Sequence, residues 1–378
     1  MINIGITGQT GFIGNYLFNQ LNLYKEEFKS IEFEDRFFEE SGLLNKWVEK
    51  CDVIVHLAAM NRHNDPETLY QTNIGLVNKL LGAMKVCRSK AHLLFSSSTQ
   101  EEDDNLYGKS KREGRKILAN FALENHSIFS GFVIPNVFGP FGHPYYNSFI
   151  ATFSHQLTHK EQPIIQVDSN VKLVYVGNLC QFIINRIREC TDSEKCESKE
   201  YLRVPFDFEK KVTEVLCLLE GFNEQYCKNN VIPSLRNIDE INLFNTFRSY
   251  IDHKERYPVK LTKHSDPRGS FVEIIRLGIG GQVSFSTTVP GITRGNHYHT
   301  RKIERFTVIK GKALIQLRRI GTFDVYNFEL DGNEPSFVDM PIWYTHNIKN
   351  IGEEELYTSF WINELFDEND PDTYFEEV

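Results

Sequence analysis

The feature that most constrains this chain is a turn with three regularly spaced glycines close to its start. The turn follows a β-branched run at residues 2–7 and precedes apolar residues at helical spacing, 14–23. Glycines let the backbone turn tightly and approach a pyrophosphate, whose charge meets the N-terminus of the following helix. Strand, glycine turn and helix in this order predict a dinucleotide-binding fold. The candidate cofactor-binding residues of the turn are Gly8, Thr10, Gly11, Phe12, Ile13 and Gly14.

Strand-like and helix-like segments alternate through the first half of the chain. Strand-like runs occur at 52–57, 92–97, 130–137 and 172–176, and a helical pattern occupies 69–84. A repeated β-α-β order predicts a Rossmann-type α/β domain, in which helices cover both faces of a parallel sheet.

The pattern changes near residue 255. The stretch 201–252 is mostly helical, whereas short alternating strands broken by Gly, Pro and Asn-Asp clusters run from there to the end. This spacing is typical of an all-β antiparallel barrel or sandwich. A chain of 378 residues is long enough for two domains, and we predict them at 1–255 and 256–378.

Composition limits the class of protein and its partners. Lys and Arg number 42 and Asp and Glu 51, so the net charge of −9 argues against general nucleic-acid binding. No apolar run reaches the roughly 20 residues of a membrane span, and the first residues lack the basic region of a secretory leader. We therefore expect a cytoplasmic protein without a membrane segment. The seven cysteines form no CxxC pair, which favours reduced thiols over disulfides.

A second motif, Tyr107-Gly-Lys-Ser-Lys111, adds chemistry to the predicted dinucleotide site. Residues four apart project from one face of a helix, so the Lys111 ammonium is expected to lower the pKa of the Tyr107 phenol. Such a tyrosine can exchange a proton with a sugar hydroxyl or carbonyl while nicotinamide exchanges a hydride. Ser98, at a predicted strand end, can hydrogen-bond the same oxygen, and Thr99 is the alternative.

An acidic segment after the second predicted strand bears on the choice of cofactor. Glu32 or a neighbouring acid would bind the ribose hydroxyls of NAD, whereas Arg36 would accept the extra phosphate of NADP. Arg36 therefore favours NADPH over NADH. The alternative interpretation of this arginine is a solvated loop charge.

A separate constellation of ligand-type residues lies in the last third of the chain. Two histidines two residues apart point to the same side of a strand, and a glutamate and a third histidine follow. The predicted metal ligands are His297, His299, Glu304 and His346. This set suits Zn²⁺, Fe²⁺, Mn²⁺ or Ni²⁺, and Zn²⁺ is the divalent ion we expect. The spacing resembles the two cupin motifs, although Pro335 and Trp343 stand where glycine is usual.

In chain order, the glycine turn, HLAA at 56–59, SSS at 96–98 and YGKSK at 107–111 resemble the extended short-chain dehydrogenases/reductases that act on nucleotide sugars. The resemblance covers residues 1–250, and the segment from Ser98 to Tyr107 is short for the family. The roles it implies are Tyr107 as catalytic acid, Lys111 as its tuner and nicotinamide-ribose ligand, Ser98 as donor to the substrate carbonyl, Leu57, Ala58 and Ala59 as cofactor lining, and Asn136 near the phosphates of the sugar nucleotide.

The last third also resembles cupin-type deoxysugar 3,5-epimerases, through DPRGSFVE at 266–273. That resemblance implies that Arg268 contacts the nucleotide diphosphate across a dimer. Nearly the whole chain is similar to bifunctional capsule-synthesis enzymes, in which an extended reductase precedes a cupin epimerase. The residues that carry this similarity include HLAAMNR at 56–62, NSFIATF at 147–153, PGITRGNHYH at 290–299, YTHNI at 344–348 and PDTYFEEV at 371–378.

This wider resemblance implies a homodimer that acts on a UDP-2-acetamido-2,6-dideoxy-4-ketohexose. The cupin would epimerise C3, and the reductase would then reduce C4 with NADPH, giving UDP-2-acetamido-2,6-dideoxy-L-talose. Lys302 is the candidate base of the epimerase, with Tyr344 and His264 as alternatives.

A different function remains open, namely a 4-epimerase or dehydratase whose cupin is a ligand sensor or dimerisation module. A dehydratase needs an Asp-Glu pair directly after the strand-end hydroxyl. The acidic run at 101–104 is expected instead to be a solvated loop.

Overall fold

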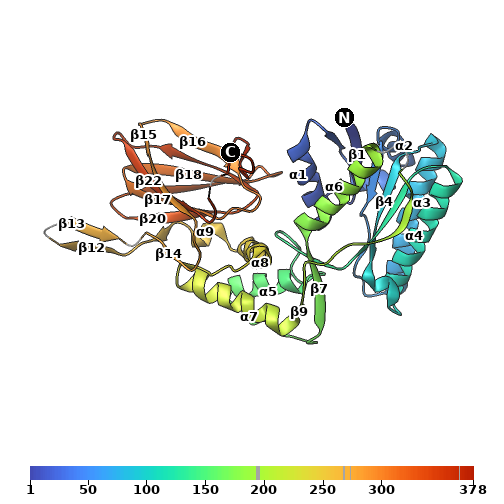
Figure 1. The fold of residues 1–378 in the computed structure, drawn as a ribbon, viewed down its shortest axis with the longest axis horizontal. Helices are drawn as coiled ribbons and strands as arrows, with labels where there is room; N and C mark the ends of the chain where they lie inside the picture. Colours follow the sequence, from blue (N-terminus) through green and yellow to red (C-terminus); the bar gives the residue numbers. More distant parts are fainter. Residues whose placement is uncertain (193–195, 267–268, 273, 366) are drawn as a thin grey trace. The chain divides into compact units, whose positions relative to one another are not determined.

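The computed structural model describes residues 1–192, 196–266, 269–272, 274–365 and 367–378. Two compact units divide the chain: the first contains residues 1–149 and 169–211, and the second contains residues 150–168 and 212–378 (Figure 1). The chain therefore passes from one unit to the other more than once. The boundary near 255 stays a prediction about domains, although the helical stretch that begins at Val212 lies in the second compact unit.

A six-stranded parallel sheet forms the centre of the first unit, which confirms the predicted Rossmann-type fold. Its spatial order is β2 (Phe28–Ile31), β1 (Ile2–Thr7), β3 (Val53–His56), β4 (His92–Ser98), β5 (Phe129–Ile134) and β8 (Lys199–Arg203). All five neighbouring pairs run parallel. The strand β3 is buried along its whole length, as expected for a sheet covered on both faces.

Helices cover both faces of this sheet (Figure 1). The helices of the first unit are α1 (Phe12–Leu21), α2 (Ser41–Val48), α3 (Pro66–Cys87), α4 (Leu106–Glu124) and α6 (Val176–Asp192), with short 3₁₀ turns η1 (Asn22–Tyr24), η2 (Asp35–Phe38) and η3 (Thr99–Glu102). Local sequence sets their starts. Asp65, for example, accepts hydrogen bonds from the Glu67 and Thr68 amides, and Pro66 begins α3.

One predicted strand lies outside the main sheet. The run at 172–176 corresponds to β7 (Asn170–Tyr175), which pairs with β6 (Asn136–Phe138) and β9 (Phe208–Lys211) in a separate three-stranded sheet. The chain leaves the main sheet after β5 at Pro135, which has no N–H to donate to a strand ladder. The prediction that this run extends the parallel series was therefore wrong.

The second unit combines helices with two antiparallel five-stranded sheets, as expected for a cupin-like fold. One sheet has the order β11 (Val259–Lys260), β20 (Ser336–Met340), β17 (Glu304–Lys310), β22 (Leu356–Ile362) and β15 (Gln282–Thr288). The other has the order β19 (Val325–Asp331), β18 (Lys312–Arg319), β21 (Tyr344–Asn350), β16 (Thr293–Tyr298) and β23 (Tyr374–Phe375).

Shorter elements complete this unit. They are α5 (Phe149–Thr158), α7 (Val212–Phe222), the π-helical turn η4 (Asn223–Lys228), α8 (Ile238–Arg248), α9 (His253–Arg256), the pair β10 (Val231–Ile232) and β14 (Arg276–Leu277), and the hairpin β12 (Lys263–Asp266) and β13 (Gly269–Val272). Among the described residues, no helix combines the length and apolar character needed to cross a membrane.

Two sequence expectations about individual residues were wrong. Cys190 and Cys196 form a disulfide, with their Cα atoms 4.9 Å apart, which is within bonding range. Glu101 is 4% exposed, although we expected a solvated loop. Its carboxylate pairs with the Arg115 guanidinium at 2.7 Å and contacts the Ser97 hydroxyl, so the charge is buried with partners.

The buried Glu101 makes a testable difference to stability. Replacing Glu101 by Ala leaves the buried Arg115 guanidinium with one carboxylate partner, Glu200 at 2.7 Å, so we expect the first unit to be destabilised toward the lower end of about 3–5 kcal/mol. The matched control is Glu102→Ala in the same turn, since Glu102 pairs with Arg203 at 2.9 Å on the exposed surface. That change should alter stability by about 1 kcal/mol or less. Hydrogen exchange of the β4 amides measures both, and equal effects would contradict the assignment of a buried pair.

Candidate active site and metal centre

The glycine turn brings the backbone of the first unit into close contact with itself. Gly8 has a φ of 69°, and a Cβ atom there would lie 2.9 Å from the Ala58 Cα. A Cβ atom at Gly14 would lie 2.1 Å from the Gly8 carbonyl oxygen, so only glycine fits. Gly11 is the residue before α1, and it has no side chain that could accept hydrogen bonds from the first amides of the helix. The turn therefore leaves helix amides for an anionic ligand such as a pyrophosphate.

A cavity of about 340 Å³ extends from this turn. The predicted site residues that line it are Gly8, Gly11, Phe12, Ile13, Gly14, Leu57, Ala58, Ala59, Ser98, Thr99, Tyr107, Lys111 and Asn136. Two predicted cofactor residues lie outside this lining. Thr10 is exposed, and Arg36 is an exposed residue whose guanidinium pairs with the Glu34 carboxylate at 2.8 Å.

Helix α4 positions the tyrosine and lysine of the second motif. The Asn105 side chain accepts a hydrogen bond from the Gly108 amide at 2.7 Å and so fixes where the helix begins. Tyr107 lies in the first turn, and Lys111 follows one turn later with its Nζ 5.8 Å from the centre of the Tyr107 ring. The ammonium also donates to the Ser96 carbonyl at 2.9 Å, which ties α4 to the end of β4.

Burial dominates the electrostatics of this pair. It lowers the pKa of Lys111 to about 8, since a charged amine loses its hydration. It raises the pKa of Tyr107 to about 12, and the nearby Tyr146 adds to this shift. The expected lowering of the Tyr107 pKa was therefore wrong, because the contact with Lys111 does not outweigh burial. At neutral pH the phenol is protonated and can act as an acid.

Sequence reasoning missed two residues beside the tyrosine. The Tyr107 hydroxyl donates to the Asn61 side-chain oxygen at 3.1 Å, and the Asn61 amide donates to the Tyr146 hydroxyl at 3.3 Å. Both Asn61 and Tyr146 line the cavity. Asn61 lies in the HLAAMNR segment, which was a usable signal. Tyr146 lies in the loop between β6 and α5 and carried no comparable signal.

Buried Asn73 connects the Asn61 segment to the tyrosine helix. Its side chain accepts from the Met60 amide at 2.7 Å and donates to the Met60 carbonyl at 3.0 Å. It also donates to the Ser110 hydroxyl at 3.1 Å, which in turn donates to the Tyr107 carbonyl at 2.7 Å. This chain of bonds fixes the distance between the two segments.

The strand-end hydroxyl predicted to bind substrate has a local role as well. The Ser98 hydroxyl accepts a hydrogen bond from the Gln100 amide at 3.2 Å and so begins the turn η3. Ser98 and Thr99 are both half-buried and both line the cavity, so the geometry leaves both as donors to a bound carbonyl. Asn136 lines the same cavity from the start of β6.

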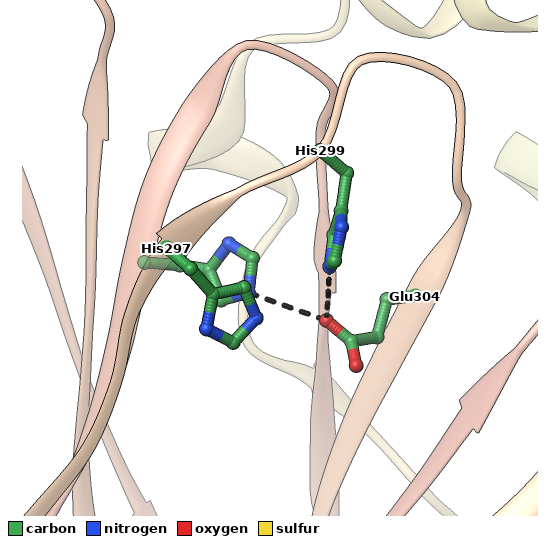
Figure 2. A group of neighbouring side chains, drawn as sticks. His297, His299 and Glu304 are labelled. Carbon is green, nitrogen blue, oxygen red and sulfur yellow. Dashed lines mark hydrogen bonds and ion pairs between the residues drawn. The ribbon is translucent and has the colours of Figure 1, made fainter. Parts of the chain in front are cut away.

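The second unit brings the four predicted metal ligands together (Figure 2). His297 on β16 lies directly opposite His346 on β21, and His299 follows the end of β16. Glu304 begins β17 in the other sheet, so the cluster lies between the sheets. One Glu304 oxygen is 3.3 Å from Nε2 of His299 and 3.2 Å from Nε2 of His346. The ligand atoms of all four residues lie within 4.8 Å of one another.

The protonation states of His297 and Glu304 suit a divalent ion, whereas the pKa of His299 is raised despite its burial by contacts with Glu304 and Asp372, so a metal bound there would displace a proton. Burial, together with the neighbouring imidazoles, lowers the pKa of His297 to about 4, so this imidazole is neutral. Burial alone would raise the pKa of Glu304, but hydrogen bonds and charge from His299 and His346 hold it well below its usual range. Neutral imidazole and ionised carboxylate are the forms that bind metals. The residues therefore fit the expected ion.

Trp343 departs from the family pattern but keeps its backbone shape. Its φ of 60° lies in the left-handed region, where glycine is favoured. Its amide donates to the His299 carbonyl at 2.7 Å, and its ring stacks on Tyr298 with centroids 5.6 Å apart. These contacts explain how a tryptophan can occupy a position where glycine is usual, next to the candidate metal centre.

The candidate bases have different surroundings. The buried Lys302 ammonium donates to the Pro371 carbonyl at 2.6 Å. Burial raises the pKa of Tyr344 to about 12, and its ring packs against His253. Arg268 lies outside the described residues, as does the side chain of His264.

Comparisons with known proteins cover both parts of the chain. Residues 264–374 match the family described as polysaccharide biosynthesis C-terminal domain. The chain is also 30% identical over 125 residues to the spore coat polysaccharide biosynthesis protein SpsL of Bacillus subtilis, covering 30% of this chain and 82% of that protein.

Two relatives extend over the whole chain. A UDP-2-acetamido-2,6-beta-L-arabino-hexul-4-ose reductase of Pseudomonas aeruginosa is 33% identical, covering 98% of this chain and 97% of its own. The crystal structure of the capsular polysaccharide assembling protein CapF from Staphylococcus aureus is 32% identical, covers 100% of both chains and has a TM-score of 0.62. Residues 4–197, which contain the glycine turn, Tyr107 and Lys111, match a further family model. The chain belongs to the NAD dependent epimerase/dehydratase family.

Proposed function

We propose that this protein is a bifunctional nucleotide-sugar enzyme of capsule or lipopolysaccharide synthesis. It epimerises C3 and then reduces C4 of a UDP-2-acetamido-2,6-dideoxy-4-ketohexose, giving UDP-2-acetamido-2,6-dideoxy-L-talose on the way to UDP-N-acetyl-L-fucosamine. The observation that carries the reduction is that the glycine turn, Tyr107 and Lys111 line one cavity. The name of the Pseudomonas aeruginosa relative, a hexul-4-ose reductase, supports the same step.

The reduction needs a hydride, which NADPH supplies when it is bound at the glycine turn. The protonated Tyr107 phenol gives its proton to the oxygen at C4 as the carbonyl becomes a hydroxyl. Ser98, or its neighbour Thr99, donates a hydrogen bond to the same oxygen and orients the carbonyl. The buried Lys111 cation stabilises the phenolate that forms. The preference for NADPH over NADH rests on Arg36 in the sequence, since a guanidinium after the second strand suits a ribose phosphate; in the structure Arg36 pairs with Glu34 outside the cavity lining.

The epimerisation belongs to the second unit in this proposal. The 4-keto group makes the C3 proton acidic, and removal and return of that proton invert the centre. Lys302 is our candidate for the base, and it would remove the C3 proton as the neutral amine and return it as the ammonium; its hydrogen bond to the Pro371 carbonyl supports a fixed orientation. The ligands His297, His299, Glu304 and His346 would hold Zn²⁺. Four protein ligands fill a tetrahedral shell, which favours an ion that stabilises the site.

A cytoplasmic homodimer goes with this proposal, because nucleotide sugars are cytoplasmic substrates and the resembling families pair. Arg268 would then contact the diphosphate of UDP across the dimer, and Asn136 would lie near the phosphates in the reductase cavity.

Replacing Tyr107 by Phe should separate the two reactions. Loss of the proton donor should slow NADPH oxidation about 10²–10⁴-fold, while solvent deuterium still enters C3 of the 4-keto sugar. Tyr201→Phe is the control, since Tyr201 is 44% exposed. The measurement combines NADPH absorbance with proton NMR. Loss of the C3 exchange in the Tyr107 variant would contradict separate sites.

The pKa of Lys111 predicts how the reduction depends on pH. The positive charge of Lys111 is needed to stabilise the Tyr107 phenolate, and this charge is lost as the pH rises through the folded pKa of about 8. The kcat/KM for NADPH, which reports the free enzyme, should therefore fall above about pH 8. Exposed Lys109 on the same helix allows a control, Lys109→Met, with an unchanged profile. A flat profile up to pH 10 would contradict a role for the charge of Lys111.

Removing one ligand tests the metal centre. His346→Ala should weaken Zn²⁺ binding by more than ~100-fold, since outer-shell losses alone reduce affinity about 10–100-fold. It should also abolish deuterium exchange at C3. His159→Ala removes an exposed histidine of the second unit and should change neither property. Metal content after dialysis, together with chelator competition, gives the answer. Full metal content in the His346 variant would show that the cluster does not bind the ion.

A further inference from the structure

We propose that Asp372 is a positioning residue of the metal centre, and that it orders the ligand loop and orients His299. The inference rests on the proposed metal site and adds to it a residue outside the predicted ligand set. Asp372 lies far from the ligands in sequence, in the segment 371–376, yet it is 1% exposed and contacts the loop between His299 and Glu304.

The Asp372 carboxylate holds this loop through its backbone. It accepts hydrogen bonds from the successive amides of Thr300, Arg301 and Lys302, each at 3.0 Å. It also accepts one from the Thr300 hydroxyl at 2.6 Å. Consecutive amides that point at one anion form a concave binding site, so the carboxylate fixes the curvature of the loop. The loop joins His299 to Glu304 and therefore sets the separation of two ligands that lie in different sheets.

The Asp372 backbone carbonyl acts on a ligand directly. It lies 2.5 Å from Nδ1 of His299, which must donate because a carbonyl oxygen can only accept. That bond places the proton on Nδ1 and leaves the lone pair of Nε2 available to bind a metal. Nε2 is the atom that faces the Glu304 carboxylate at 3.3 Å. Such outer-shell bonds fix the tautomer and ring orientation of metal-binding histidines.

The chain around Asp372 is held on both sides. The carbonyl of Pro371, just before it, accepts from the Lys302 ammonium at 2.6 Å. After it, β23 pairs with β16, with Phe375 opposite His297. The φ of Asp372 is 37°, in the left-handed region that aspartate enters more readily than most residues. An aspartate thus satisfies both the backbone shape and the loop amides.

The experiment measures metal affinity in variants of the full chain. Asp372→Gly keeps the carbonyl and suits the left-handed backbone but removes the carboxylate, and Asp372→Asn replaces one acceptor oxygen by a donor. Both should weaken Zn²⁺ binding about 10–100-fold in chelator competition. Asp370→Asn is the matched control, because Asp370 is exposed and pairs with Arg301 of the same loop at 2.9 Å. Its affinity should stay within about twofold of the wild type.

A second readout distinguishes positioning from a purely structural tie. With Co²⁺ in place of Zn²⁺, the visible absorption spectrum of the Asp372 variants should shift, because the ligand geometry changes. The rise in melting temperature on adding Zn²⁺ should also shrink. A structural tie alone would lower the melting temperature equally with and without the ion. Thr300→Ala, a milder variant that removes one hydrogen bond to the carboxylate, should weaken affinity in the same direction if the Asp372 variants fail to fold.

The outcomes separate the two proposals. If the wild type binds no divalent ion, the metal site itself fails and this inference with it. If the wild type binds Zn²⁺ but the Asp372 variants, or Thr300→Ala in their place, bind it with unchanged affinity and spectrum, only the role of Asp372 is overturned.

Discussion

Parallel strands that end at one edge of a sheet are the constraint on which the reductase site depends. Thr7, His56 and Ser98 end β1, β3 and β4, and ligands of such sheets bind beyond these carboxyl ends. The Thr7 hydroxyl hydrogen-bonds the His56 ring at 2.7 Å and accepts from the Ala58 amide at 3.3 Å, which joins two of the strand ends. The hydrogen bond from Lys111 to the Ser96 carbonyl connects α4 to the end of the third strand, β4. The glycine turn and the tyrosine thereby face one cavity.

The candidate metal centre has a different arrangement, since the four residues that could bind an ion come from antiparallel strands of two different sheets and the loop between them. A direct pair across β16 and β21 aligns His297 with His346, but Glu304 belongs to the other sheet. The loop from His299 to Glu304 therefore connects the residues of one sheet to the carboxylate of the other. We therefore expect the Asp372 carboxylate, which accepts from three amides of that loop, to influence the geometry of the whole group. The two candidate sites share no residues, so each can be altered by substitution while the other is left intact.

Much of this architecture could be predicted from sequence because its signals are local. The glycine turn needs close backbone contact at Gly8 and Gly14, and the histidine spacing reports strand periodicity. What could not be predicted depends on distant partners. Glu101 looks like a loop charge until Arg115 of another helix is placed beside it. The pKa of Tyr107 depends on how deeply the fold buries the phenol. Asp372 contacts the loop between His299 and Glu304, although about 70 residues separate them in the sequence.

The central claim is that one chain epimerises C3 and reduces C4 of the same sugar. The direct test is proton NMR of the product formed from a UDP-linked 2-acetamido-2,6-dideoxy-4-ketohexose and NADPH in deuterated water. We predict deuterium from solvent at an inverted C3 and protium from NADPH at C4. Protium at C3 with its configuration retained, or a product formed without consumption of NADPH, would contradict the proposal.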